Sequence, residues 1–261
     1  MSTTPSTRFA IDGPVASFTF NRPETRNALT WEMYDALVAA CDRVDADHDI
    51  RVFVLKGAGK AFASGTDISQ FTTLSSADDA VAYEKRLDGV VDRVEAVTVA
   101  TIAQVEGVAA GGGCLIALAC DLRVCTPNAK FGVPVARTLG NCLSATSCSR
   151  LLELAGPALL KDIMFTGRLI DGVEAQRVGL ANRLAEADAI EGVVTELAGT
   201  IAANAPLTIH ATKEGVRRIL RSQRLDRAAL DDLVIACYTS EDFRNAVRSF
   251  LAKQPPVFNG R

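Results

Sequence analysis

Three consecutive glycines, residues 111–113, stand between two apolar runs and constrain the fold more than any other feature of this chain. Residues 99–105 before them are rich in β-branched and small side chains, and residues 114–119 after them are all apolar. This order predicts a strand, a tight turn and the start of a buried helix. Unpaired N–H groups at a helix N-terminus attract negative charge, so the turn suits an anion or a developing oxyanion. Glycines also occur in ordinary turns, which leaves a purely structural role open.

Strands and helices alternate along the first part of the chain. The pattern predicts strands at residues 15–20, 52–55 and 122–125, in addition to the strand before the glycines. It predicts helices at residues 31–44, capped by Thr30, and at residues 76–95. Alternation of this kind indicates an α/β core with largely parallel strands.

The pattern becomes helical beyond Pro157. The helices expected there cover residues 187–203, 206–220, 225–237 and 241–251. We therefore divide the chain into a core at residues 1–190, which holds the candidate site, and a helical C-terminal segment at residues 191–261.

Composition excludes several classes of protein. The chain has 261 residues, of which 48% are hydrophobic, so it can bury a sizeable core. A net charge of −3 argues against nucleic-acid binding, which needs clustered Lys and Arg. No apolar stretch is long enough to span a membrane, and the first residues lack signal-peptide features, so we expect a cytoplasmic protein without a membrane partner. Seven cysteines without C-x-x-C spacing and only two histidines predict reduced thiols and no metal site.

Several short motifs follow one another in a fixed order from residue 21 to the C-terminus. They are NRP at 21–23, NAL at 27–29, KAFASGTDI at 60–68, VEG at 105–107, GGGC at 111–114, FG at 131–132 with Pro134, FTG at 165–167, and a tail with Phe250 and Lys253. Together they resemble the enoyl-CoA hydratase/isomerase (crotonase) superfamily over nearly the whole chain.

The resemblance implies a spiral of stacked ββα turns whose C-terminal helices form a homotrimer, often a hexamer of two trimers. It implies an acyl-CoA substrate, with coenzyme A as part of the thioester and no tightly bound cofactor. By motif position, the backbone N–H groups of Thr66 and Gly112 form an oxyanion hole for the thioester oxygen. Fixed donors of this kind stabilise charge that develops only along the reaction, by roughly 3–4 kcal/mol for each donor.

Further residues are implied to bind coenzyme A. By position these are Arg26, Ala63, Gly65, Asp67, Ile68, Phe250 and Lys253. For the basic residues among them, a solvated surface charge is an equal alternative.

Two positions depart from the family pattern. Family hydratases carry one glutamate directly after GGGC and another after the proline that follows FG, and this chain has Leu115 and Val135 there. Addition of water needs groups that orient the water and move protons, so ordinary hydration is not expected. Isomerisation is disfavoured too, since it commonly uses the second acid. The two side chains predict an apolar acyl pocket instead.

Other polar residues are candidates for the missing chemistry. Glu106 is a candidate base at the end of the strand before the glycines, Arg137 a candidate ligand for an acyl carboxylate, and Ser144 a candidate proton relay. Glu84 and Asp88 share one face of the helix at 76–95, where solvent-facing acids are an equal explanation. Each of these residues also has an ordinary structural alternative.

The leading hypothesis is an enzyme that holds an acyl-CoA enolate at Thr66 and Gly112, of the lyase or isomerase class. One alternative is decarboxylation of a malonyl-type CoA, because loss of CO₂ forms the enolate without a base. Arg137 would then hold the departing carboxylate. A non-catalytic homologue that binds acyl-CoA is the other alternative.

Overall fold

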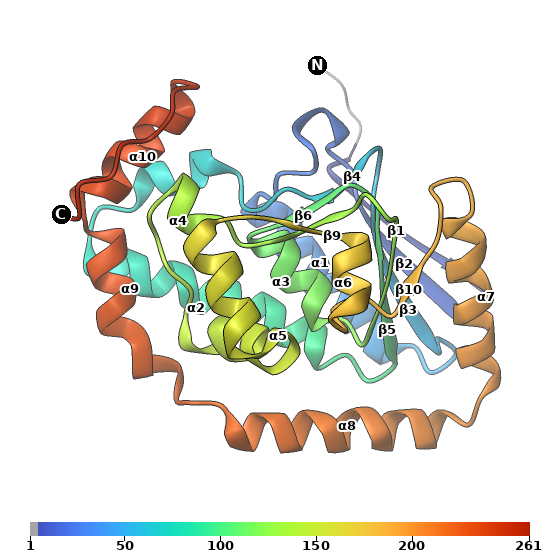
Figure 1. The fold of residues 1–261 in the computed structure, drawn as a ribbon. Helices are drawn as coiled ribbons and strands as arrows, with labels where there is room; N and C mark the ends of the chain where they lie inside the picture. Colours follow the sequence, from blue (N-terminus) through green and yellow to red (C-terminus); the bar gives the residue numbers. More distant parts are fainter. Residues whose placement is uncertain (1–4) are drawn as a thin grey trace.

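Two β-sheets form the framework of the protein, and a computed structural model describes it over residues 5–261 (Figure 1). The six-stranded sheet has the order β1 (Thr7–Asp12), β2 (Val15–Phe20), β3 (Val52–Gly57), β5 (Ala100–Val105), β7 (Leu122–Cys125) and β10 (Arg183–Leu184). The four-stranded sheet has the order β4 (Ala61–Ala63), β6 (Val108–Ala110), β8 (Lys130–Gly132) and β9 (Ile170–Asp171).

The strands of the large sheet pair in parallel from β2 to β10, and only β1 pairs antiparallel with β2. The prediction of an α/β core with largely parallel strands is therefore confirmed. The small sheet was not predicted, because its strands have only two or three residues and carry too few side chains to show a period.

Helices cover both faces of the large sheet. On one face lie α1 (Trp31–Ala46), α2 (Ala77–Glu95) and α3 (Gly112–Ala119), which share the main core with Phe53 and Leu55 of β3. The other face carries α7 (Ile190–Ala203), which packs on Val52 and Val54 (Figure 1). Successive side chains of a strand point to opposite faces, so β3 contributes to both layers.

A second group of helices follows the small-sheet strands. It consists of α4 (Val135–Thr138), α5 (Ala145–Thr166) and α6 (Gly172–Arg177). Two short 3₁₀ helices, η1 (Pro23–Thr25) and η2 (Ile68–Thr73), lie earlier in the chain. Among residues 5–261, none of the helices combines the length and hydropathy that crossing a bilayer requires.

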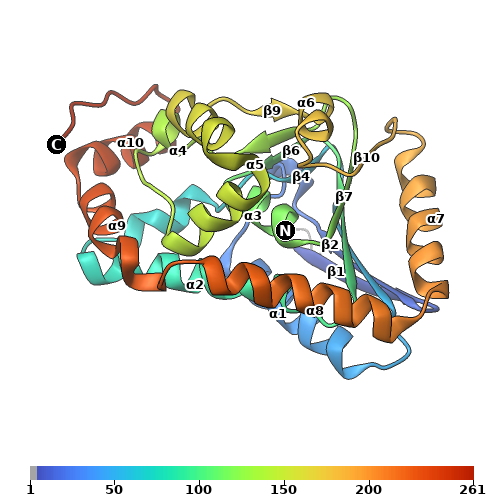
Figure 2. The same ribbon diagram turned by 60° about the horizontal axis from the view of Figure 1, so that its bottom comes forward.

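The C-terminal helices run along the outside of the molecule. Helix α8 (Pro206–Gln223) has no buried residue and carries the chain from α7 back toward α2 (Figures 1 and 2). Then come η3 (Arg227–Leu230), α9 (Asp231–Tyr238) and α10 (Glu241–Leu251). The helix expected at 225–237 is thus split, because Asp226 caps the separate 3₁₀ turn. Helix α9 packs on α2 and α10 on η2. The division at residue 190 stays a prediction.

Candidate active site

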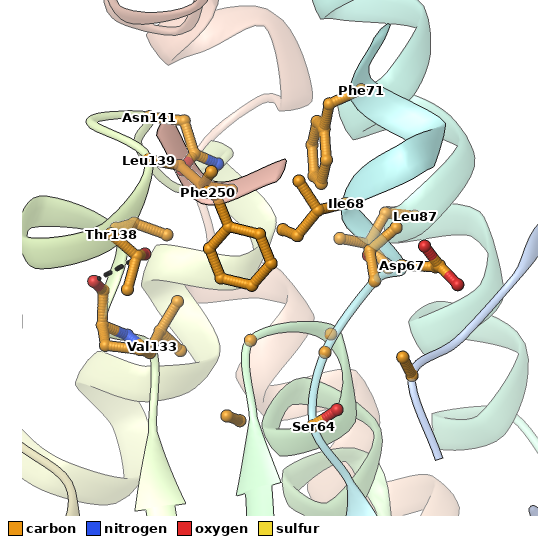
Figure 3. A pocket seen from close by; sticks show the side chains of 18 of the residues that line it. Ser64, Asp67, Ile68, Phe71, Leu87, Val133, Thr138, Leu139, Asn141 and Phe250 are labelled. Atoms are coloured by element: carbon orange, nitrogen blue, oxygen red, sulfur yellow. Dashed lines mark hydrogen bonds between the residues drawn. The ribbon is translucent and has the colours of Figure 1, made fainter. Parts of the chain in front are cut away.

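A cavity of about 370 Å³ opens where the start of α3 meets η2, α2 and the segment before α5. Figure 3 shows Phe250 of α10 pointing into it, with Ile68, Phe71 and Leu87 on one side and Val133 and Leu139 on the other. Most of its wall is apolar. The C-terminal end of α10 and the glycine turn therefore line the same cavity.

Thr66 and Gly112 lie side by side at the wall of this cavity. A Cβ added to Gly112 would be 3.5 Å from Thr66 Oγ1. Leu29 N–H donates to Gly65 O at 2.8 Å and Asp67 N–H donates to Leu29 O at 2.8 Å, which leaves the Thr66 N–H between them without a partner. Gly112 is the first residue of α3, so its N–H has no acceptor within the helix. Within residues 5–261, neither N–H donates a hydrogen bond.

Two buried tyrosines form hydrogen bonds with the side chain of Thr66 next to the glycine turn. Thr66 Oγ1 is hydrogen-bonded to the hydroxyl of Tyr34 at 2.9 Å and to that of Tyr83 at 2.9 Å. A Cβ at Gly112 would come within 2.3 Å of the Tyr34 hydroxyl, so only glycine fits there. Burial raises the pKa of both tyrosines, which keeps them neutral hydrogen-bonding groups. No pattern in the sequence predicts this layer, because Tyr34 belongs to α1 and Tyr83 to α2.

Glu84 is a buried acid in the wall of the same cavity. The residue is only 5% exposed, yet it belongs to the cavity wall. The Tyr238 hydroxyl donates to its Oε1, and Ser144 N–H donates to its Oε2 at 3.3 Å. Burial raises the pKa of Glu84 to about 7, although the Tyr238 hydrogen bond acts in the opposite direction.

Asp88, one turn further along α2, is also buried but does not line the cavity. It accepts hydrogen bonds from Ser144 Oγ at 2.8 Å and from Ser147 Oγ at 3.0 Å. Burial raises its pKa above the ordinary range, against the two hydroxyl donors. The solvent-facing explanation of Glu84 and Asp88 is therefore wrong, since loop and C-terminal residues cover this face of α2.

Most of the predicted site residues come together at the cavity. Those that line it are Arg26, Gly65, Thr66, Asp67, Ile68, Gly112, Leu115, Val135 and Phe250. Leu115 is almost fully buried, and Val135 is half-buried at the start of α4. The two positions at which the resemblance leads us to expect glutamates thus contribute apolar surface.

Five predicted site residues do not line the cavity. These are Ala63, Glu106, Arg137, Ser144 and Lys253. Ala63 is buried beneath it, where its carbonyl packs against Gly113. Arg137 and Lys253 are exposed. Ser144 caps α5 by accepting from Ser147 N–H, which is the structural alternative considered for it.

The geometry gives no support to Glu106 as a base. Gln104 Nε2 donates to its Oε1 at 3.3 Å and also to Glu191 Oε2 at 3.1 Å. Glu106 therefore belongs to a polar group between β5 and α7. A residue at a strand end is not necessarily near the following turn, because side chains alternate between the two faces of a sheet.

Two backbone N–H groups without a partner among residues 5–261 thus lie at the wall of a largely apolar cavity, and comparison with known proteins identifies the family. The chain belongs to the enoyl-CoA hydratase/isomerase family, whose model matches residues 10–261. The predicted resemblance is confirmed.

Individual relatives match over almost their whole length. A probable enoyl-CoA hydratase of Mycobacterium bovis is 32% identical over 251 residues, which is 96% of each chain. The crystal structure of an enoyl-CoA hydratase/carnithine racemase from Magnetospirillum magneticum is 33% identical, with a TM-score of 0.80 over 99% of this chain and 97% of that one. A methylmalonyl-CoA decarboxylase in complex with 2-nitronate-propionyl-CoA is 25% identical, with a TM-score of 0.90 over 98% and 99%. The predicted fold class is thereby confirmed.

Proposed function

We propose that this protein is an acyl-CoA enzyme that stabilises a thioester enolate with the backbone N–H groups of Thr66 and Gly112. The observation that carries the proposal is that these two donors lie side by side at the cavity and are unpaired among residues 5–261. Loss of a proton or of CO₂ next to the thioester moves negative charge onto its oxygen. Preorganised donors stabilise that charge by roughly 3–4 kcal/mol each, and the start of α3 adds the positive end of its dipole.

We expect the coenzyme A part of the substrate to extend beyond the cavity that holds the acyl group. Gly65, Asp67 and Ile68 follow β4 in the chain and line the cavity, as does the exposed Arg26. Asp67 forms an ion pair with Arg22 at 3.1 Å, which holds the Asp67 side chain in place. Lys253 follows α10 and Ala63 lies under the wall, so their contact with coenzyme A rests on the family resemblance alone. No tightly bound cofactor is part of the proposal.

Hydration of an enoyl-CoA is not the proposed reaction, because Leu115 and Val135 replace both water-activating glutamates. We expect the wild type to leave crotonyl-CoA unchanged, as followed by the absorbance of the enoyl thioester. A Leu115→Glu/Val135→Glu variant is expected to gain hydration if it folds, because the oxyanion donors are already present.

A family hydratase serves as the positive control, and circular dichroism checks the fold of the variant. Hydration by the wild type at a rate comparable to the control would contradict this reading of the two apolar positions.

Decarboxylation of a malonyl-type CoA is the second candidate, and the TM-score of 0.90 to a methylmalonyl-CoA decarboxylase favours it. Loss of CO₂ forms the enolate directly. Arg137 does not line the cavity and so gives no support as the carboxylate ligand. Release of CO₂ from malonyl-, methylmalonyl- or ethylmalonyl-CoA tests this candidate, and no release from any of them rules it out. Acyl-CoA binding without any turnover would instead indicate a non-catalytic homologue.

We also propose a homotrimer or homohexamer, because α8 exposes apolar side chains without burying any of its residues. Leu207 is 81% exposed, Val216 52% and Ile219 60%. A Val216→Asp/Ile219→Asp variant should lower the sedimentation mass from a multiple of three chains toward one. The control, Arg221→Asp, changes charge on another face of α8 and should leave the mass unchanged. A monomeric wild type would contradict the proposal.

A further inference from the structure

Two carboxyl groups line the acyl cavity, and their surroundings differ. Asp67 is partly exposed, and although burial acts in the opposite direction, the hydrogen bond from the Ser69 hydroxyl and the ion pair with Arg22 hold its pKa below the ordinary range. Glu84 is buried, and no cation within residues 5–261 forms an ion pair with it. A buried carboxyl without a counter-ion is costly to keep as the anion, so its position calls for an explanation other than stability.

Helix α2 brings Glu84 to the oxyanion turn through the residues on either side of it. The hydroxyl of Tyr83, the preceding residue, is 2.9 Å from Thr66 Oγ1. The Cδ1 of Leu87, one turn later, would be 3.5 Å from a Cβ at Gly112. Because one helical turn advances only about 5.4 Å, the Glu84 turn of α2 faces both oxyanion donors.

The C-terminal segment and the loop before α5 hold the carboxyl group. Tyr238 of α9 donates to Glu84 Oε1, and Asn141 Nδ2 donates to the Tyr238 oxygen at 2.8 Å. Because the Tyr238 oxygen accepts a hydrogen bond from Asn141, its own hydroxyl proton is available for donation to Glu84. Ser144 N–H reaches the other carboxylate oxygen at 3.3 Å. These donors stabilise the anion while burial favours the neutral acid, so both forms are accessible near neutral pH.

We infer that Glu84 is the acid–base residue of this enzyme and that it replaces, from α2, the glutamates absent at positions 115 and 135. The inference rests on the proposed function, since it needs the enolate that Thr66 and Gly112 hold. A catalytic group with a pKa of about 7 matches the requirement for exchanging protons at neutral pH.

The reaction that a single such carboxyl supports is a 1,3-proton shift in a 3-enoyl-CoA. Glu84 removes a proton from C2, and the C–H electron pair moves into the thioester to form a dienolate. The resulting Glu84 acid returns the proton to C4, where the electron pair of the C3–C4 double bond forms the new C–H bond. The C1–C2 electron pair of the dienolate becomes the C2–C3 double bond, and the thioester carbonyl re-forms. No water is added and no oxidant is needed, so the products are a 2-enoyl-CoA and the original carboxylate.

The experiment compares the wild type with Glu84→Gln, Glu84→Asp and Asp88→Asn in two assays. One follows conversion of 3-butenoyl-CoA to crotonyl-CoA by absorbance, and the other follows deuterium uptake at C2 of butyryl-CoA in D₂O by mass spectrometry. We expect Glu84→Gln to lose at least about 100-fold in kcat in both assays with little change in KM. Glu84→Asp should restore part of the rate. Asp88→Asn, a buried carboxyl that does not line the cavity, should stay within a few-fold of the wild type.

The pH dependence separates a catalytic role from a structural one. The wild-type isomerisation rate should rise as pH increases through about 7, where Glu84 becomes the base, and this rise should be absent from the residual rate of Glu84→Gln. The folded-state pKa lies above the unfolded value of 4.5, so wild-type stability should fall as pH rises from about 4.5 to 7. The Tm of Glu84→Gln should not show that fall.

The outcomes distinguish failure of the Glu84 inference from failure of the proposed enolate function. A folded Glu84→Gln that retains wild-type rates overturns the inference and leaves the oxyanion proposal standing. A wild type that binds butyryl-CoA but catalyses neither reaction overturns the inference, and it contradicts the enolate function itself if CO₂ release from the three malonyl-type CoA substrates is absent as well. Should Glu84→Gln not fold, an unchanged rate in Glu84→Asp together with a wild-type rate that does not rise through pH 7 overturns the inference.

Discussion

Replacing Gly112 by alanine should lower kcat/KM for 3-butenoyl-CoA isomerisation by about 100- to 1,000-fold, the cost of losing one oxyanion donor. The added methyl carbon would lie 2.3 Å from the Tyr34 hydroxyl, so the turn or the tyrosine must move. The Gly112 N–H then no longer points at the thioester oxygen. Small displacements of catalytic groups cost orders of magnitude in rate because the donors work only when preorganised.

Two control variants give this prediction a second readout. Adding Tyr34→Phe to Gly112→Ala removes the clashing hydroxyl and should recover about tenfold of the lost rate, since the turn can return part of the way. Gly199→Ala on α7 adds a methyl group with no neighbour within 4 Å and should leave the rate unchanged. Wild-type kinetics in Gly112→Ala would contradict the assignment of the oxyanion hole.

Replacing Arg123 by leucine should lower the free energy of unfolding by about 4 kcal/mol, because it leaves at least two buried carbonyls without donors. Arg123 is only 4% exposed, and its guanidinium donates to Leu180 O at 2.5 Å and to Cys120 O. It also reaches Ala117 O at 3.3 Å, one of the last carbonyls of α3. Burial lowers the pKa of Arg123, but these carbonyl acceptors stabilise the buried charge.

Urea unfolding at pH 7 measures this loss. The control is Arg218→Leu, because Arg218 has a side chain that is 75% exposed and forms its ion pair with Glu214 of the same helix, so its loss should change stability little. A decrease below about 1 kcal/mol in Arg123→Leu would contradict the prediction. The result bears on the site as well, because Arg123 anchors the C-terminal end of the helix whose first residue is Gly112.

Much of the framework was predictable from the sequence because it depends on local patterns. The strand at Val15–Phe20 alternates buried and half-buried side chains, and α1 begins where Thr30 accepts from Met33 N–H. Helix α2 begins with a capping box formed by Ser76 and Asp79. Periodicity and caps act over a few residues, so the chain specifies them without reference to distant segments.

The oxyanion positions were predicted in a different way. Thr66 and Gly112 were located by motifs that resemble a family, and the structure brings both to one cavity wall. The three glycines alone were also compatible with a turn that has a purely structural role. Arg137 and Lys253 were also predicted to contact the substrate, but neither lines the cavity. Both side chains are exposed, and a neighbouring motif does not fix the direction of an exposed side chain.

Residue identity and short spacing specify the alternation of strands and helices, the glycine turn and the apolar side chains at positions 115 and 135, so these features could be predicted before the fold was known. The burial of Glu84 in the wall of the cavity, by contrast, follows from packing between distant segments. Its partner Tyr238 is 154 residues away along the chain, and Ser144 is 60 residues away. Solvent exposure and a shifted pKa are properties of what packs on a side chain, and no local pattern records that.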